Sequence, residues 1–259
     1  MKRVPDPNRI TVDRKSGKLI TADIPYILNP VDLITIELAL QLKEQSGAQL
    51  VAVSIDEPAA EFEMREALAM GCDRGLLLAD EAFERADTLA QASIFRTALD
   101  RLVQPQLVLA ASRSIDHNWS TVGPQLAQLL DWPLVIEAES IDVRGDRLQG
   151  IAHTGAFRAR VDADLPAVVT VARDANKPRT PTSWGVAAAF DDQVVEVKTL
   201  RDLGVDPTAQ KTFEPSTRLL RVQQQDIKRE RRLLEGEPAE VGRLLARRLV
   251  DQGWVGRRP

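Results

Sequence analysis

The chain has 259 residues, of which 44% are hydrophobic, so it can bury a substantial core and is expected to be globular. Its 34 basic and 38 acidic residues give a formal charge of -4, which argues against a protein built to neutralise a nucleic-acid backbone. Cys72 is the single cysteine, which excludes an intrachain disulfide and a multi-cysteine metal site and favours a reducing compartment.

No apolar run approaches the roughly 20 residues that a membrane-spanning helix needs. The first ten residues also lack the apolar stretch of a secretory signal. We therefore expect a protein of the bacterial cytoplasm that is not embedded in a membrane.

Helical and short apolar segments alternate between about residues 30 and 135, which is typical of βα units on a parallel sheet. Gly71 suits the C-cap of one predicted helix, and Asp87 or Thr88 suits the N-cap of the next. Helices are predicted over residues 30–43, 58–70, 88–102 and 121–130, and buried strands over residues 49–55, 75–80 and 107–112.

The pattern changes after residue 133 to β-rich segments separated by turn residues. Strands are predicted over residues 134–143, 147–153, 156–163 and 166–172, and we expect them to be antiparallel. Pro178 and Pro181 predict a loop over residues 176–183, and the polar stretch from residue 202 to 236 is expected to be extended or loosely packed.

The last predicted helix, residues 238–250, is amphipathic. Its apolar stripe requires a partner surface. The stripe consists of Val241, Leu244, Leu245 and Leu249.

The position of the first strand is unusual. A doubly wound sheet normally opens with an apolar strand that becomes central, whereas this sequence reaches Lys2 and Arg3 at once. Either residues upstream of Met1 or another segment is expected to fill that position.

The spacings GxGxxG, GxxxxGK[ST], HExxH and GxSxG are missing. His117 and His153 are the only histidines and are too few for a histidine-based metal site, so we predict no metal site. We also predict no catalytic residue, and Cys72 is expected to be a structural thiol.

The segment from residue 111 to 133 is more informative, because it follows a buried strand and opens a helix. Small polar residues there, with Gly123 allowing close approach of the backbone, would present free N–H groups to an anion. Phosphate is the natural ligand for such a site.

Seven segments together resemble the beta (small) subunit family of electron-transfer flavoproteins, in the family's order and at about its spacing over residues 2–207. The block ALAMG-DRG is the most specific of them. The segments are KRVPD (2–6), NP (29–30), ALAMGCDRG (67–75), SID (114–116) with VGPQLAQLLDWP (122–133), LPAVVT (165–170), NKPR (176–179) and DLGVD (202–206).

The resemblance implies a Rossmann-like α/β fold of the adenine-nucleotide alpha hydrolase-like type, with a parallel sheet, added antiparallel β segments and a C-terminal arm and helix. Residues 1–207 would form the nucleotide-binding domain, and residues 208–259 an extension and helix that pack on a partner subunit.

It further implies an electron carrier without bond chemistry of its own, because the redox steps belong to the flavin. The chain would form a heterodimer with an alpha subunit and share FAD with it. It would accept electrons from flavin dehydrogenases and pass them to a quinone reductase or a similar acceptor.

The resemblance also implies a nucleotide in this subunit, either AMP or, as in the electron-bifurcating branch of the family, a second FAD. The segment VGPQ (122–125) is similar to the bifurcating branch, whereas LDWP (130–133) is similar to the AMP-binding one. Carried over by position, the nucleotide contacts are Asn29, Pro30, Val31, Asp32, Ile55, Ala111, Asp116, Ser120, Thr121, Val122 and Gly123.

The loop that family members use to dock onto dehydrogenases often carries a leucine that enters an apolar pocket of the partner, and Ala175 stands at that position. Removing most of a leucine side chain would forfeit roughly 2 kcal/mol of burial, so we expect a different or narrower dehydrogenase partner. The implied docking residues are Ala175, Asn176, Pro178 and Arg179.

Two other functions compete with the electron carrier. A stand-alone nucleotide-binding sensor on the same scaffold would be stable as a lone chain without flavin. A hydrolase would use His117 with Ser114 or Ser120, although the sequence shows no recognisable carboxylate to orient the histidine and no recognisable oxyanion hole.

Overall fold

The computed structural model describes residues 1–12, 19–20, 23–192, 194–205, 213–218, 220, 231 and 233–255. The chain divides into two compact units, Met1–Leu219 and Leu220–Pro259. The boundary predicted at residue 207 lies outside the described residues, and the assignment of functions to two domains stays a prediction.

The first unit is an α/β structure. Its strands are β1 (Arg3–Pro5), β2 (Thr11–Val12), β3 (Leu19–Ile20), β4 (Tyr26–Leu28), β5 (Val51–Ile55), β6 (Arg74–Leu78), β7 (Leu107–Ala111), β8 (Leu134–Arg144), β9 (Arg147–Thr154), β10 (Phe157–Asp164), β11 (Ala167–Val171) and β12 (Val195–Lys198). Its helices are α1 (Pro30–Ser46), α2 (Glu61–Met70), α3 (Thr88–Ala98), α4 (Val122–Leu130) and α5 (Ser183–Asp191), with short helical turns η1 (Pro58–Ala60), η2 (Glu81–Phe83) and η3 (Leu99–Val103).

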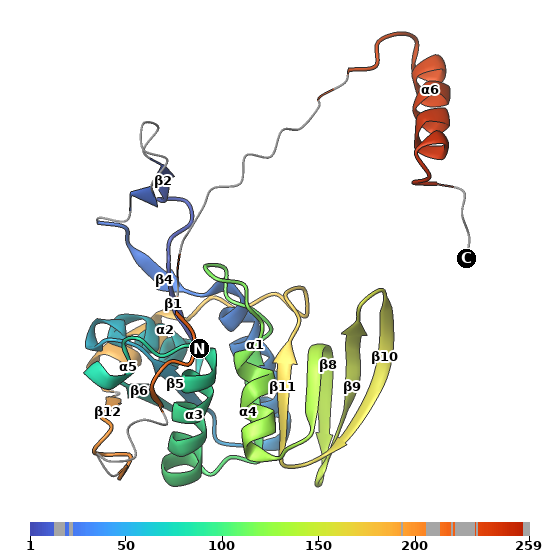
Figure 1. Cartoon of the computed structure of the whole chain (residues 1–259). Coiled ribbons are helices and arrows are strands. Elements are labelled where there is room, and N and C mark those ends of the chain that lie inside the picture. Colours follow the sequence, from blue (N-terminus) through green and yellow to red (C-terminus); the bar gives the residue numbers. More distant parts are fainter. Residues whose placement is uncertain are drawn as a thin grey trace. The chain divides into compact units, whose positions relative to one another are not determined.

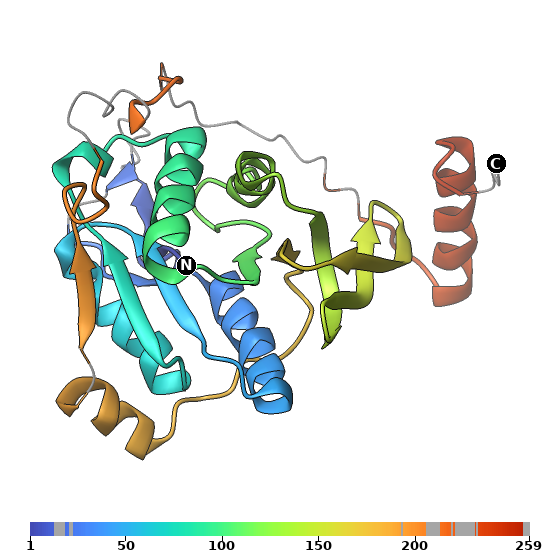
Figure 2. The same cartoon turned by 90° about the horizontal axis from the view of Figure 1, so that it is seen from below.

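Two sheets form the centre of this unit. One has the order β12-β6-β5 and is parallel throughout, and the other has the order β10-β9-β8-β11-β7. Helices α1, α2 and α5 cover one face, and α3 and α4 cover the other (Figure 1; Figure 2). The arrangement confirms the predicted α/β class with added antiparallel strands.

The helices and strands predicted up to residue 130 are confirmed, because their apolar periodicity and caps are local signals. Gly71 ends α2 with a positive φ of 123°, which suits glycine. Asp87 caps α3, with its carboxylate accepting a hydrogen bond from the Ala90 N–H at 3.0 Å.

The prediction that all four strands after residue 133 are antiparallel is wrong for the last one. β8, β9 and β10 do form an antiparallel meander, but β11 pairs in parallel with both β7 and β8. All five residues of β11 are buried. A short continuous apolar strand between two neighbours is typical of parallel sheets, and its direction is set by distant partners rather than by its own sequence.

Several elements have no counterpart among the predictions. β1 pairs with β4, and β2 pairs with β3, both antiparallel. Helix α5 follows the predicted loop, and β12 adds an edge to the smaller sheet beside β6. The expectation of loose structure over residues 202–236 falls mostly outside the described residues, although Leu203 and Phe213 are buried in the core of the first unit.

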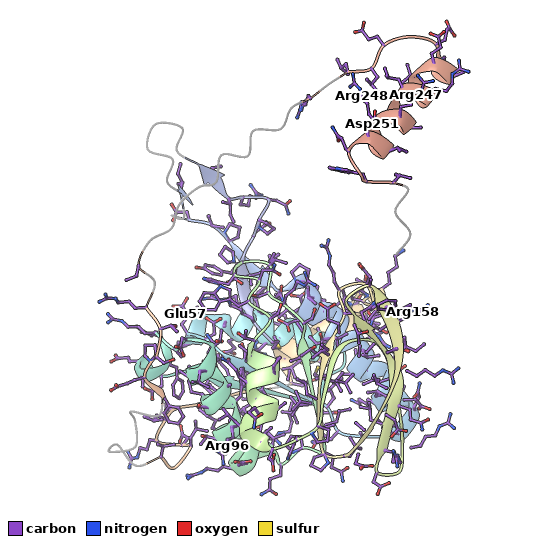
Figure 3. The ribbon with its side chains drawn as sticks, turned by 45° about the vertical axis from the view of Figure 1, so that its right-hand side comes forward. Glu57, Arg96, Arg158, Arg247, Arg248 and Asp251 are labelled. Carbon is purple, nitrogen blue, oxygen red and sulfur yellow. The ribbon has the colours of Figure 1, made fainter. Side chains whose placement is uncertain are left out.

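The second unit contains helix α6 (Pro238–Asp251), which confirms the predicted amphipathic helix. None of its residues is buried, and Leu244 and Leu245 on the apolar stripe are 42% and 46% exposed. Figure 3 shows Arg247, Arg248 and Asp251 on the same helix. Across the part of the chain that the structure describes, no helix is long and apolar enough to cross a membrane.

Candidate nucleotide-binding site

Asn29 joins three segments at the start of α1. It is 1% exposed and directly precedes the helix. Its Oδ1 accepts a hydrogen bond from the Ile115 N–H at 3.2 Å, and its Nδ2 donates to the Arg113 carbonyl at 3.2 Å. Its backbone N–H donates to the Lys2 carbonyl at 2.9 Å. Asn29 therefore holds both the N-terminal segment and the loop after β7 against α1.

Asp32 lies in the first turn of α1 and is 6% exposed. Its Oδ2 accepts hydrogen bonds from the Lys2 N–H at 2.8 Å and from Asn29 Nδ2 at 3.2 Å. Of the two residues between Asn29 and Asp32, Pro30 is exposed and Val31 is buried. The side chains of Val31 and Asp32 thus face the protein interior, where they shape the start of the helix.

Asp116 is the centre of a polar group beside this junction. Lys2 Nζ donates to its Oδ2 at 2.5 Å, and His117 Nδ1 lies 2.8 Å from the same oxygen. Burial acts to raise the pKa of Asp116, but hydrogen bonds from Lys2 and Ser114 together with the Lys2 charge outweigh it and hold the pKa well below its usual range. Asp116 is therefore ionised at neutral pH, and the ammonium group of Lys2 is the positive charge beside it.

The loop from residue 118 to 121 leads into α4 through an unusual backbone. Asn118 and Ser120 adopt positive φ angles of 54° and 56°, the left-handed region that few residues other than glycine visit readily. Thr121 precedes the helix without a side-chain hydrogen bond to it. The first N–H groups of α4, from Val122 onward, are thus left without a side-chain cap, as at helix starts that bind anions.

Gly123 packs directly on the sheet. A Cβ atom at this residue would lie 2.6 Å from Thr170 Cγ2 and 3.8 Å from the Ala110 Cβ. The contact with β11 alone accounts for the missing side chain. It also places the first turn of α4 beside the carboxyl end of β7.

Buried polar atoms around this turn lack partners among the described residues. They are Ser112 Oγ, Arg113 Nε and Gln125 Oε1. Ser112 is 4% exposed and directly follows β7. A buried polar atom without a partner costs about 1–3 kcal/mol, so a polar ligand at this place would stabilise the fold.

Two of the implied nucleotide contacts, Ile55 and Ala111, lie at the ends of strands. Ile55 is the last residue of β5 and Ala111 the last residue of β7, and both are half-buried.

A cavity of about 610 Å³ is lined in part by Ile55. Its charged lining consists of five acidic residues and one basic residue, Arg3, and this negative balance disfavours a phosphate. The acidic residues are Asp56, Glu57, Asp80, Glu81 and Glu84. Of the implied nucleotide contacts, only Ile55 reaches this cavity, so the two places are different sites.

The sequence model of the electron transfer flavoprotein domain matches residues 16–201. The chain belongs to the electron transfer flavoprotein family. It is 34% identical over 206 residues to the electron transfer flavoprotein subunit beta of Thermoanaerobacterium thermosaccharolyticum, a match that covers 80% of this chain and 79% of the relative.

Two further relatives support the same family. The chain is 33% identical over 211 residues to the caffeyl-CoA reductase-Etf complex subunit CarD of Acetobacterium woodii, which covers 80% of this chain and 79% of the relative. It is 31% identical over 243 residues to the electron transfer flavoprotein subunit beta of Bacillus subtilis, covering 93% and 92%. Its role is that of an electron-transfer flavoprotein beta subunit.

The loop over residues 173–179, for which the resemblance implies a docking role, is fastened to α1 in this flavoprotein subunit. Asn176 Nδ2 donates to the Ile34 carbonyl at 2.9 Å, and Arg179 forms ion pairs with Glu37 and Glu44. Ala175 packs against the apolar cluster that surrounds Leu38 and Val169. Three of the four implied docking residues therefore contact the subunit itself, and Pro178 is half-buried between them.

Exposed side chains lie next to them in the same loop. Arg173, Asp174 and Lys177 are exposed, and Trp184 at the start of α5 is 86% exposed. These residues are free to face another protein.

Sequence reasoning missed four residues that build the candidate site, namely Lys2, Ser112, Arg113 and Ile115. Lys2 and Asp116 lie 114 positions apart, and Asn29 and Arg113 lie 84 apart. No local pattern carries such pairings. The segment KRVPD could have drawn attention to Lys2, because Lys2 directly precedes β1.

Proposed function

We propose that this beta subunit binds one adenine nucleotide at the junction of α1, β7 and α4 and works in a heterodimer with an alpha subunit. The observation that carries the nucleotide is this junction, where Asn29 draws two loops together beside buried polar atoms that lack partners in the described chain. The loop backbone and the start of α4 supply N–H groups, which suit phosphate oxygens.

The charges at the junction are nearly balanced, which decides how a nucleotide would be held. Lys2 faces Asp116, and Arg113 faces Glu137 at 2.8 Å. Neither cation is surplus, so N–H groups would contribute most of the phosphate contacts, with Lys2 adding one charge-assisted hydrogen bond. The side chains of Asn29 and Asp32 are already paired within the chain, so they would shape this arrangement rather than supply phosphate contacts.

The nucleotide is AMP or, in the alternative, a second FAD. The segment VGPQ at residues 122–125 favours the FAD of the bifurcating branch, and LDWP at residues 130–133 favours AMP. Flavin, when bound, supplies the redox chemistry, whereas the chain binds and orients it.

The C-terminal unit is the observation that favours a partner subunit. An apolar stripe with half-exposed leucines on α6 requires a covering surface. We propose that residues 208–259 pack on the alpha subunit, with which FAD is shared. This favours the carrier over a stand-alone sensor, and a cytoplasmic location stays a prediction.

We propose flavin dehydrogenases as donors and a quinone reductase or similar acceptor. The name of the relative from Acetobacterium woodii places that protein in a complex with a reductase, which supports a lasting association with an oxidoreductase partner. We further propose that this subunit performs no bond chemistry. Asp116 does orient His117, but no hydrogen bond joins the imidazole to a serine among the described residues.

The deciding experiment is a count of nucleotides released on denaturing the co-expressed heterodimer. One FAD and one AMP would establish the ordinary carrier, and two FAD the bifurcating type. A heterodimer that releases neither would contradict the proposal.

A matched pair of variants tests the place of the site. Lys2→Ala should release the nucleotide of this subunit about tenfold more readily, the effect of one lost charge-assisted hydrogen bond. Lys177→Ala, which removes an exposed lysine from the docking loop, should leave retention unchanged. Equal retention in all three proteins would move the nucleotide away from Lys2.

A further inference from the structure

The loop between β7 and α4 presents an aromatic side chain beside the candidate nucleotide site. Trp119 is 55% exposed, and within the described residues its indole belongs to none of the four apolar clusters of the first unit. A single exposed apolar side chain is common on a protein surface. What distinguishes Trp119 is the backbone that holds it and its place just before the start of α4.

Hydrogen bonds fix the segment that leads into Trp119. The N–H of Ile115 donates to Asn29 Oδ1 at 3.2 Å, which ties this segment to the start of α1. The N–H of Asn118 donates to the Ser114 carbonyl at 3.0 Å and closes the turn over residues 114–118. Trp119 therefore follows directly on a turn whose position is set by the helix that begins the site.

The residues on either side of Trp119 adopt an uncommon backbone conformation. Asn118 and Ser120 both lie in the left-handed region, with φ angles of 54° and 56°. Asparagine tolerates this region, whereas serine has a steric cost there that glycine would avoid. Backbone strain of this kind is concentrated at ligand sites, where the surrounding structure maintains it. Here it sets the direction of the tryptophan between two sharp changes of chain direction.

His117 lies against the indole. The ring centroids of His117 and Trp119 are 5.4 Å apart and their planes are inclined at 64°, an edge-to-face arrangement. His117 is itself oriented by Asp116, whose Oδ2 lies 2.8 Å from its Nδ1. An edge-to-face contact covers at most one face of the indole. The other face therefore stays open for stacking.

The open ring is within reach of a group bound at the start of α4. Trp119 stands three residues before Val122, where the N–H groups that suit a phosphate begin. Three residues span at most about 10 Å, so a ring that a ribose joins to this phosphate can reach the indole. Ser112 Oγ and Gln125 Oε1, which lack partners in the described chain, lie around the same turn and suit the polar part of such a ligand.

We propose that Trp119 stacks on the fused heteroaromatic ring of the nucleotide and that His117 positions the indole for this contact. The inference rests on the nucleotide site proposed above. AMP carries an adenine ring, and FAD carries adenine and isoalloxazine. Stacking on an indole requires only a planar aromatic face, which all of these rings offer.

The experiment measures how fast the purified heterodimer releases the nucleotide of this subunit. Trp119→Ala should speed release about tenfold, the usual order of effect for one lost stacking contact. Trp119→Phe keeps an aromatic face and should stay within about threefold of the unsubstituted protein. The matched control is Trp184→Ala, which removes a tryptophan that is 86% exposed on α5 and should leave release unchanged. Equal release from Trp119→Ala and the unsubstituted protein would overturn the proposal.

Chromatography of the retained nucleotides distinguishes the two sources of the ring. If Trp119→Ala loses AMP, the stacked ring is adenine. If the count falls from two FAD to one, the stacked ring belongs to FAD. Weaker association with the alpha subunit at an unchanged rate of nucleotide release would assign the indole to the partner and overturn the stacking.

Lys2→Ala separates a failure of the stacking from a failure of the site. Faster release from Lys2→Ala with unchanged release from Trp119→Ala would keep the site and overturn the stacking. Unchanged release from both variants would contradict the site as well.

Rescue tests the positioning role of His117. His117→Ala should speed release about threefold, because the indole loses the ring that holds its orientation. His117→Phe keeps an aromatic ring beside the indole and should restore slow release. Equal release from the two variants would overturn the positioning role.

Discussion

Arg179 and Glu37 form a two-point ion pair between the loop over residues 173–179 and α1. Arg179 Nε donates to Glu37 Oε2 at 2.8 Å, and Nη2 donates to Oε1 at 3.0 Å. The backbone N–H of Arg179 adds a third hydrogen bond to Oε2 at 3.0 Å. Glu37 is 5% exposed, so its carboxylate depends on these contacts and on Gln41 Nε2.

We expect Arg179→Ala to lower the free energy of unfolding by about 1–2 kcal/mol, because it leaves a buried carboxylate with too few donors. The loss stays below that of a fully buried ion pair, because the Arg179 side chain is 36% exposed. Urea denaturation measures the change. Arg179→Lys should restore part of the loss, because lysine keeps the charge but not the two-point geometry.

Arg173→Ala is the matched control in the same loop, because Arg173 is exposed. It should change the free energy of unfolding by less than about 0.5 kcal/mol. It should instead weaken binding to the donor dehydrogenase if the exposed part of the loop makes the contact. A larger loss of stability from Arg173→Ala than from Arg179→Ala would contradict the division into anchoring and exposed residues.

Gly123→Ala tests the contact between α4 and β11. The new methyl group would meet Thr170 Cγ2 at 2.6 Å, so the helix must shift, and we expect a loss of about 1–3 kcal/mol in the free energy of unfolding. Nucleotide retention should fall with it. Gly242→Ala, in α6 with open space around it, should instead stabilise its helix by up to about 1 kcal/mol. Similar effects of both substitutions on thermal unfolding would argue against the close packing.

Asp87 gives the fold a dependence on acid pH. Burial acts to raise its pKa, but hydrogen bonds from Ala90, Ser216 and Thr217 outweigh this and lower the pKa to about 2. The folded pKa is thus below the ordinary value of about 3.9, so the stabilisation is complete above that value and is lost as the pH falls towards 2.

The substitution Asp87→Ala should cost about 1–2 kcal/mol at pH 7, the usual effect of losing a helix cap. The difference from the unsubstituted protein should shrink as the pH is lowered from 4 towards 2. Denaturation at a series of pH values measures it. A difference that stays constant over this range would show that the charge of Asp87 is not the source of the stabilisation.

Cys72 should be inert in the folded protein. It is 2% exposed, and burial raises the pKa of its thiol to about 12. At pH 8 we expect a thiol reagent to modify Cys72 at least roughly 100-fold more slowly than in concentrated urea. The reagent cannot reach the buried sulfur, and almost none of the thiol is present as the reactive thiolate. Arg96→Cys, at an α3 position whose side chain is 51% exposed, supplies the reactive comparison. Rapid modification of Cys72 without denaturant would contradict its burial.

The sequence predicted most of the elements because their signals are local. The buried strands up to residue 112 and the cap at Asp87 need only neighbouring residues to be recognised. The direction of β11 was predicted wrongly because AVVTV fits a parallel and an antiparallel strand equally well. α5 was missed because it begins directly after a proline-rich loop and contains Gly185, a poor helix former that here fits against the Ala69 carbonyl.

The candidate nucleotide site was likewise predicted only in part. Asn29 was named by position from the resemblance, and three segments meet at this residue. The residues that form hydrogen bonds with Asn29 are distant in the sequence, so no local pattern predicted them. The docking residues were named by position alone, and only their contacts with α1 reveal that Arg179 and Asn176 serve as anchors.

The place of β11 also constrains how the protein is made. Its two neighbours, β7 and β8, both precede it in the chain, and the hairpin of β9 and β10 is translated in between. Until β11 has been synthesised, the edges of β7 and β8 that it will occupy stay unpaired. Open strand edges readily pair with other chains. The nascent subunit is therefore open to mispairing at these two edges until β11 emerges.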